Sequence, residues 1–285
     1  GTEKLCETRN YYQNVPFTDR TDYLAAPNNN LGYCETVAKL GSYEVPERAQ
    51  YVRTAGSELS RRARHLIGHG THAMDIGAVT VFMYALRERE LILDLFEEYC
   101  GARLTYNCMR IGGLPLDIPT GWGRKVHAFC DVMESKIPEY EELLTNNRIW
   151  LQRTRGIGVI SGEAATALGL CGPPLRGSGV YRDVRKDEPY AAYDEFEFNV
   201  PLGTTGDTYD RYLVRLEEFR QSLRIIRQAV DGLPEGPVMG KVPRLIKPKA
   251  GETYHAIESP KGELGYFIVS DGRSTNPYRL RVRPP

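Results

Sequence analysis

The sequence predicts an α+β protein in which a helical body precedes a small antiparallel β-element. Long segments carry apolar residues every three or four positions, most clearly at 207–230, as amphipathic helices do. Residues 251–285 instead combine short apolar runs with Gly and Pro, which is typical of strands joined by tight turns. A Pro/Gly-rich linker at 233–252 connects the two parts, and we expect residues 1–285 to form a single domain.

The N-terminal part, residues 1–45, is predicted to be a loop followed by a short helix. The stretch VPFTDRTDYLAAPNNN at 15–30 is rich in residues that favour turns. The next stretch, LGYCETVAKL at 31–40, is predicted to be helical.

The helical body is predicted over 46–232. It begins at Pro46, because proline is common in the first turn of a helix. We expect a break near Gly68 and Gly70, since glycine weakens a helix interior. Further helices are predicted at 80–100, 123–147 and 207–230.

Two boundaries of the last helix follow from its flanking residues. Asp207 can cap its start and Gly232 can end it. The preceding segment YDEFEFNVP, residues 193–201, alternates apolar and acidic residues and is predicted to be a short strand. The closing meander covers 251–285, and edge protection and turn chemistry are the simplest explanation of its charges, Glu258, Lys261, Glu263 and Asp271.

Composition excludes several classes of protein. The 37 basic and 37 acidic residues balance, so nothing favours a nucleic-acid partner. No apolar run reaches the about 18 residues of a transmembrane helix. The six cysteines form no C-x-x-C pair, so we expect buried, reduced thiols and no metal or cluster held by this chain. No G-x-G-x-x-G motif follows a strand, so we expect no bound NADH or flavin.

Three local clusters invite a functional interpretation. The segment HLIGHGTHAMD places His65, His69, His72 and Asp75 at helical spacing, which is compatible with a metal site but more often reflects packing. The turn RTDY, from Arg20 to Tyr23, offers a phenol that could donate a proton to a bound carbonyl, although a salt-bridged loop is the simpler interpretation.

The third cluster is a pair of arginine sets, either of which could contact another protein chain. The two sets are Arg61, Arg62 and Arg64, and Arg220, Arg224 and Arg227. The second set, together with Glu217 and Glu218, is predicted to form a solvated helix face.

Taken together, eleven ordered motifs resemble one family. They are GTEKLCE, DRTDYL, VPERAQYVR, GTHAMDIGA, RERELILDLFEEYCGAR, RIGG, ELLTNNRIWLQRTRGIGV, GLCGPPLRGSG, YDRYLVRLEEFRQSLRIIRQA, YHAIESPKGELGYFIVSDG and PYRLRVRPP. Across nearly the whole chain they resemble the 49 kDa subunit of respiratory complex I, which is the D-type subunit of bacterial NADH–quinone oxidoreductase. The resemblance implies the helical-bundle fold of the [NiFe]-hydrogenase large subunit.

The resemblance also implies a role in reducing quinone, the substrate. In this family the 49 kDa subunit forms the quinone pocket with a small subunit that holds the terminal [4Fe–4S] cluster. Tyr23 matches the tyrosine that hydrogen-bonds the quinone headgroup, and Asp75, Arg20 and His72 are expected to support the pocket. Further implied partners are the 30 kDa-type subunit and the membrane arm. The expected location is the cytoplasmic face of the bacterial inner membrane, or the matrix side in mitochondria. The hairpin charges are expected to combine turn chemistry with docking near partner subunits and the quinone region.

Several departures from the family pattern accompany the resemblance. The histidine that pairs with the match of Asp75 lies upstream of Gly1, as does a modified arginine, and both chain ends suggest truncation. Thr105 stands where many members have a histidine near the cluster. Some two dozen residues expected between Lys247 and Gly251 are missing.

Two alternative functions are weighed against this one. A membrane-bound hydrogenase relative would need nickel ligands, but Asp22 and Ala25 stand roughly where the first pair of ligand cysteines would be. A non-catalytic assembly subunit would not need the hydroxyl of Tyr23 for quinone turnover.

Overall fold

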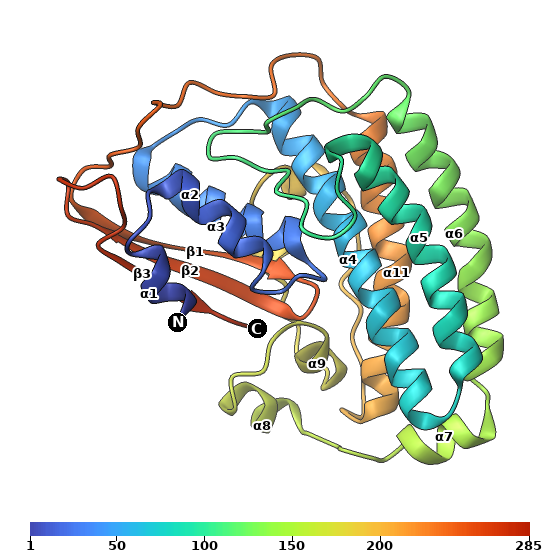
Figure 1. The fold of residues 1–285 in the computed structure, drawn as a ribbon. Coiled ribbons are helices and arrows are strands. Elements are labelled where there is room, and N and C mark those ends of the chain that lie inside the picture. Colours follow the sequence, from blue (N-terminus) through green and yellow to red (C-terminus); the bar gives the residue numbers. More distant parts are fainter.

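Four long helices packed side by side form one half of the molecule, and a three-stranded sheet forms the other (Figure 1). The computed structural model describes all residues from Gly1 to Pro285. The bundle helices are α4 (Glu47–Ile76), α5 (Val79–Cys100), α6 (Trp122–Leu144) and α11 (Thr208–Asp231). Both α4 and α6 contact α5 and α11, so the four helices enclose a shared core. No helix combines the length and apolar character needed to cross a membrane.

Helix α4 continues for 30 residues without a break, so the predicted interruption near Gly68 and Gly70 is wrong. A Cβ atom at Gly70 would lie 3.1 Å from Ala85 Cβ and 3.1 Å from Phe82 Cα. Glycine therefore lets α5 approach α4 closely, and the packing gained on that face offsets the helix propensity lost. The helix ends at Gly77, whose φ of 108° places it in the left-handed region.

Residues 1–45 contain more helix than predicted. They form α1 (Thr2–Cys6), α2 (Tyr11–Asp19) and α3 (Ala26–Gly41). A capping box starts α2: the Asn10 side chain accepts from the Gln13 N–H, and the Gln13 side chain accepts from the Asn10 N–H. The N-x-x-Q spacing of Asn10 and Gln13 predicts the start of this helix, but the many turn-forming residues that follow favoured a loop instead.

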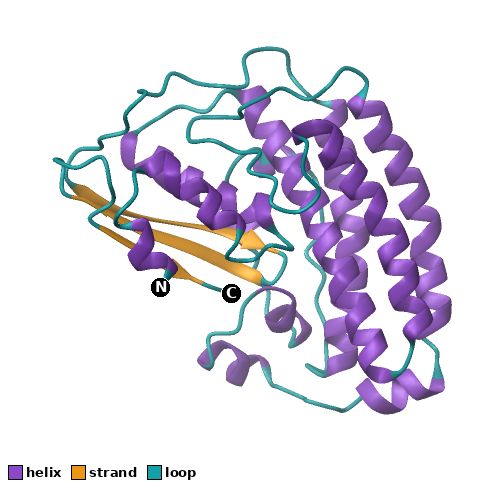
Figure 2. Ribbon diagram, viewed as in Figure 1, coloured by secondary structure: helices purple, strands orange, loops and turns teal.

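The C-terminal meander is confirmed (Figure 2). Strands β1 (Gly251–Ser259), β2 (Gly262–Ser270) and β3 (Arg279–Arg283) pair antiparallel in the order β1-β2-β3. Helix α3 packs on the sheet and also contacts α4, so it links the sheet to the bundle. The edge-to-face contact of Tyr33 on α3 with Tyr266 on β2, 5.9 Å between centroids, lies at this junction.

Short helices connect α6 to α11. They are α7 (Arg148–Thr154), α8 (Gly162–Ala167), α9 (Gly172–Gly177), α10 (Val184–Asp187) and the 3-10 turn η1 (Tyr193–Glu195). The predicted strand at 193–201 is wrong. Its backbone N–H groups find side chains of α11 instead of a neighbouring strand: Glu197 donates to Gln228 at 3.0 Å and Asn199 to Gln221 at 2.9 Å.

The predicted limits of α11 are confirmed. The Asp207 carboxylate accepts from the Asp210 N–H at 2.8 Å, and Gly232 is the C-cap residue. Glu218, however, is buried, so it does not belong to the predicted solvated face. Arg61 and Arg62 are also fully buried and do not form a free surface for a partner.

Candidate functional site

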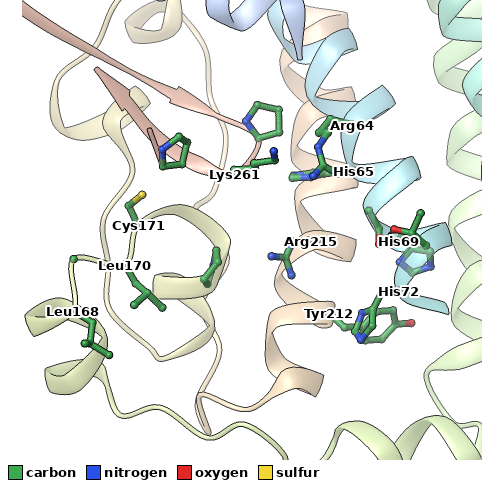
Figure 3. Close-up of a pocket in the computed structure, with 16 residues that line it drawn as sticks. Arg64, His65, His69, His72, Leu168, Leu170, Cys171, Tyr212, Arg215 and Lys261 are labelled. Atoms are coloured by element: carbon green, nitrogen blue, oxygen red, sulfur yellow. Dashed lines mark hydrogen bonds between the residues drawn. The ribbon is translucent and has the colours of Figure 1, made fainter. Parts of the chain in front are cut away.

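A cavity of about 730 Å³ lies between the bundle and the β1–β2 turn (Figure 3). Its volume is in the range of small-molecule and cofactor sites. Helices α4 and α11 form one wall, and the segment around α9 forms the facing wall. The lining residues are Arg64, His65, Gly68, His69, Thr71, His72, Leu168, Gly169, Leu170, Cys171, Pro174, Tyr212, Arg215, Pro260, Lys261 and Pro285.

His65 forms the most tightly bonded polar contact of this wall. Its Nε2 lies 2.6 Å from Glu218 Oε2, and the second oxygen of Glu218 accepts from Arg176 Nη2 at 2.6 Å. Burial lowers the pKa of His65 to about 4, and Glu218 only partly opposes that shift. Burial would raise the pKa of Glu218, but Arg176 and His65 together hold it well below its usual value. At neutral pH the pair is therefore a neutral imidazole that donates to a carboxylate.

His69 and His72 are held by aromatic rings instead of carboxylates. His69 stacks on Tyr212, with 5.4 Å between ring centroids, and burial lowers its pKa to about 3. His72 lies 4.8 Å from Trp150, and burial lowers its pKa as well. No three His, Cys, Asp or Glu side chains gather in a way that could hold a metal ion. The three histidines on α4 contact α11 through Glu218 and Tyr212 and α7 through Trp150.

Tyr23 lies on the turn between α2 and α3, and 57% of its surface is exposed. Its hydroxyl has no hydrogen-bond partner within the chain and is free to donate outward. The preceding residue, Asp22, pairs with Lys261 at 3.0 Å, and Lys261 also lines the cavity. The Asp22–Lys261 pair thus connects the Tyr23 turn to the rim of the cavity.

The other predicted pocket residues are placed differently. His72 lines the cavity directly, whereas Tyr23, Arg20 and Asp75 do not. Arg20 is exposed and donates to the Pro16 carbonyl at 2.6 Å on the preceding helix. Asp75 is exposed in the last turn of α4, where its charge partly opposes the lowered pKa of His72.

Asp19, at the end of α2, was not singled out from the sequence. Its side chain is fully buried, accepts from the Asn107 N–H at 3.4 Å, and leaves Oδ2 without a partner. Burial raises the pKa of Asp19 to about 6. Asp19 lies four residues before Tyr23, and a carboxyl group whose pKa is raised by burial is a candidate proton-exchanging group. Only the fold identifies it, because an aspartate in a turn-rich segment is ordinarily exposed.

A buried ion network ties the bundle to the sheet behind the cavity. Three guanidinium groups face four carboxylates: Arg61, Arg176 and Arg185 against Glu58, Asp183, Glu218 and Glu258. Glu258 was predicted to protect a strand edge or to form a turn. It is instead buried, accepts from Arg176 at 2.8 Å, and so joins β1 to α9.

The other hairpin charges also have partners within the chain. Glu263 contacts Arg182 and accepts from the Tyr254 hydroxyl. Asp271 accepts from the N–H groups of Arg273 and Ser274, which confirms turn chemistry at that position.

The Tyr23 turn carries an unpaired phenol, Asp19 before it is a buried carboxyl whose pKa burial raises to about 6, and the Asp22–Lys261 pair links this turn to the cavity rim. These groups can hydrogen-bond a carbonyl oxygen and supply or store a proton.

Comparison with known proteins gives one consistent result. The family described as "Respiratory-chain NADH dehydrogenase, 49 Kd subunit" matches residues 75–250 and 241–285. In Solibacter usitatus, the D-type subunit of NADH-quinone oxidoreductase that is numbered 2 is 54% identical over 285 residues, covering all of this chain and 77% of that protein. The D-type subunit of Geotalea uraniireducens is 50% identical over 310 aligned positions, covering 79% of that protein. The D-type subunit of Bacillus mycoides is 50% identical over 286 positions, covering 78%.

The alignment lengths also bear on the short linker after Lys247. The Solibacter protein aligns over 285 positions, the length of this chain, whereas the Geotalea protein needs 310. Some relatives therefore lack the two dozen residues expected there, and the short form is not peculiar to this chain.

Proposed function

The chain belongs to the family of the 49 kDa subunit of respiratory-chain NADH dehydrogenases, the D-type subunit of NADH-quinone oxidoreductase, and from this premise we propose that it forms part of the site where quinone is reduced. The oxidoreductase activity belongs to the assembled complex, of which this chain is one subunit. Its partners are other complex I subunits.

The observation that carries the proposal is the free hydroxyl of Tyr23. Quinone reduction consumes two electrons and two protons, so a phenol beside the carbonyl oxygen can orient the ring and donate as negative charge develops. The turn that presents Tyr23 is joined to the cavity rim by the Asp22–Lys261 pair. The buried carboxyl of Asp19 immediately precedes the same turn, and burial raises its pKa to about 6, so it is a candidate to take up a proton.

The remaining parts of the proposal extend this site. His72 and Asp75, one helical turn apart on α4, and Arg20 beside the Tyr23 turn support the pocket. A small subunit with a [4Fe–4S] cluster completes it and delivers electrons, while this chain itself binds no cofactor. We place the chain in the arm that faces the cytoplasm, on the membrane arm and next to the 30 kDa-type subunit. The helical body corresponds to the [NiFe]-hydrogenase large-subunit fold without the metal.

Replacing Tyr23 by Phe in the assembled enzyme tests the proposal. The ring remains and the donor is lost, so quinone-linked turnover should fall about 5- to 150-fold, the equivalent of losing about 1–3 kcal/mol of hydrogen bonding. NADH oxidation with an artificial acceptor that bypasses quinone should be unchanged. Tyr181→Phe is the matched control, because Tyr181 is 56% exposed, as Tyr23 nearly is, but lies between α9 and α10 and not on the Tyr23 turn. Equal quinone turnover in Tyr23→Phe and wild type would show that Tyr23 has no part in the reaction.

A further inference from the structure

Asn107 lies in the loop between α5 and α6 and has an uncommon backbone conformation. Its φ of 45° places it in the left-handed region, which is sterically unfavourable for residues other than glycine. The Arg110 side chain holds this conformation: its Nη1 atom donates to the Asn107 carbonyl at 2.6 Å and to Asn107 Oδ1 at 2.9 Å. The guanidinium group therefore fixes both the backbone and the side chain of Asn107.

Arg110 is itself part of a tight turn. Its N–H donates to the Gly113 carbonyl at 2.9 Å, and its carbonyl accepts from the Gly113 N–H at 3.1 Å. The buried guanidinium group of Arg53, on α4, donates to both of these carbonyls. Arg53 is in turn paired with Glu35 on α3, at 2.6 Å. The segment that holds Asn107 is therefore anchored on two long helices.

The conformation of Asn107 directs its N–H to the carboxylate of Asp19, at the end of α2. The N–H donates to Asp19 Oδ1 at 3.4 Å, whereas Asp19 Oδ2 has no partner and the side chain is fully buried. Burial raises the pKa of Asp19 to about 6. The Asn107 N–H opposes this shift more than the charge of either Arg20 or Arg110 does. Since a hydrogen bond to the charged form favours that form, this backbone donor stabilises the ionised carboxylate.

Most groups that face Asp19 keep one charge state between about pH 4 and about pH 8, because arginine stays charged over this range. Burial raises the pKa values of Cys34 and Tyr266, and the contact with Cys100 raises that of Cys108. The same contact lowers the pKa of Cys100, so every variant described next also carries Cys100→Ser. The groups that face Asp19 are Arg20, Arg110, Cys34, Cys100, Cys108 and Tyr266.

We propose that Asn107 and Arg110 are positioning residues for quinone reduction. Together they orient the Asp19 carboxylate, which releases and regains a proton beside the Tyr23 turn. This inference rests on the proposed quinone site, because quinone reduction consumes protons and Asp19 lies directly before the turn that presents Tyr23. Neither Asn107 nor Arg110 needs to touch quinone, because their effect passes through the protonation of Asp19.

Two substitutions of Asn107 separate the backbone conformation from the side chain. Asn107→Gly adopts a positive φ readily, whereas the β-branched side chain of Asn107→Val disfavours it, and both keep the N–H. Arg110→Gln removes the guanidinium group, so it loosens Asn107 without a change at that residue. Arg20→Gln is the control for charge alone, because Arg20 acts on Asp19 through its charge but donates its hydrogen bond to Pro16.

The titration of Asp19 is read in the purified chain, as the pH dependence of the difference in unfolding free energy between each variant and the same variant carrying Asp19→Asn. Loss of a donor to the carboxylate should move this titration up by about 1 pH unit in Asn107→Val and in Arg110→Gln. Asn107→Gly should titrate as unsubstituted Asn107 does, and Arg20→Gln should shift less than Arg110→Gln. In the assembled enzyme, the part of the pH profile of quinone turnover that Asp19→Asn abolishes should move to higher pH by the same amount.

Equal titration of Asp19 in Asn107→Val and Asn107→Gly would overturn the proposal, because the backbone conformation of Asn107 would then have no effect. An equal shift in Arg20→Gln and Arg110→Gln would also overturn it, because charge alone explains that result. If Asn107→Val does not fold, Arg110→Gln carries the same test. The titration needs no quinone, so its failure is distinct from a failure of the Tyr23→Phe experiment. A shifted titration with an unchanged quinone profile would exclude both positioning residues from the reaction.

Discussion

Replacing Glu58 by Gln is expected to destabilise the fold by about 3 kcal/mol, whereas Glu258→Gln should have little effect at neutral pH. Both residues are buried carboxylates of the same ion network. They differ in the partners that each one satisfies, so the pair separates the effect of charge balance from the effect of burial.

The magnitude for Glu58 follows from its contacts and its pKa. It accepts from Arg61 at 3.0 Å, Arg185 at 3.2 Å, Tyr193 at 2.7 Å and Ser222 at 2.7 Å. Burial would raise its pKa, but these partners hold it at about 2, against 4.5 for a free side chain. This difference of about 2.5 between the pKa values of the unfolded and folded states corresponds to about 3 kcal/mol in the free energy of unfolding. That value agrees with the cost of removing one member of a buried ion pair.

Glu258 should respond in the opposite sense because the network holds one carboxylate more than it has guanidinium groups. Burial raises the pKa of Glu258, and neighbouring Asp183 adds to the shift that Arg176 opposes. Because the pKa of Glu258 is raised in the folded chain, its ionisation lowers the free energy of unfolding as the pH rises. Gln removes that charge and keeps an acceptor for Arg176, which retains Glu218 as an ionic partner. At neutral pH we expect a change within about 1 kcal/mol.

Denaturant unfolding of the purified chain, followed by circular dichroism from acidic to neutral pH, measures both variants. The deficit of Glu58→Gln should be complete above about pH 5 and shrink as the pH falls towards 2, because the stability from a lowered pKa is fully present above the unfolded pKa and is lost as the pH falls through the folded pKa. Glu258→Gln should gain stability relative to wild type as the pH rises. Equal losses in the two variants at neutral pH would refute the charge-balance argument, since burial alone would then set the cost.

Three further predictions concern the surroundings of the cavity. Lys261→Met should change the free energy of unfolding by less than about 1 kcal/mol, because Lys261 and its partner Asp22 are both partly exposed. The variant should nevertheless raise the KM for quinone of the assembled enzyme, and an unchanged KM would show that the Asp22–Lys261 pair does not position the Tyr23 turn. Gly172→Ala should destabilise the chain by more than Gly169→Ala, as measured by thermal unfolding: both have positive φ, but only at Gly172 would a Cβ overlap the backbone of the β1–β2 turn. Asp19→Asn should gain stability relative to wild type as the pH rises from about 4 to about 6, since a raised pKa makes ionisation of the buried carboxyl cost stability over that range; a constant difference between variant and wild type would exclude Asp19 as the titrating group.

Periodicity, capping and turn residues determined most of the architecture from the sequence alone. The apolar spacing and the Asp207 cap located α11, and the Gly and Pro pattern located the meander at 251–285. These signals are local, because a helix or a hairpin is specified by residues within a few positions of one another. Eleven ordered motifs likewise identified the family, and the comparisons with known proteins confirm it.

The tertiary structure decided what each charge and each glycine does. Helix α4 continues through Gly70, where the absence of a side chain lets α5 pack closely. Residues 193–201 form no strand, because side chains of α11 accept their backbone hydrogen bonds. Glu258, expected at a strand edge, is buried by helices that lie far away in sequence. Arg64 and Arg61 are three residues apart on one helix, yet only Arg61 meets a carboxylate. Burial and pairing depend on contacts between distant segments, so a charge pattern in sequence cannot distinguish an unpaired arginine from a buried ion pair.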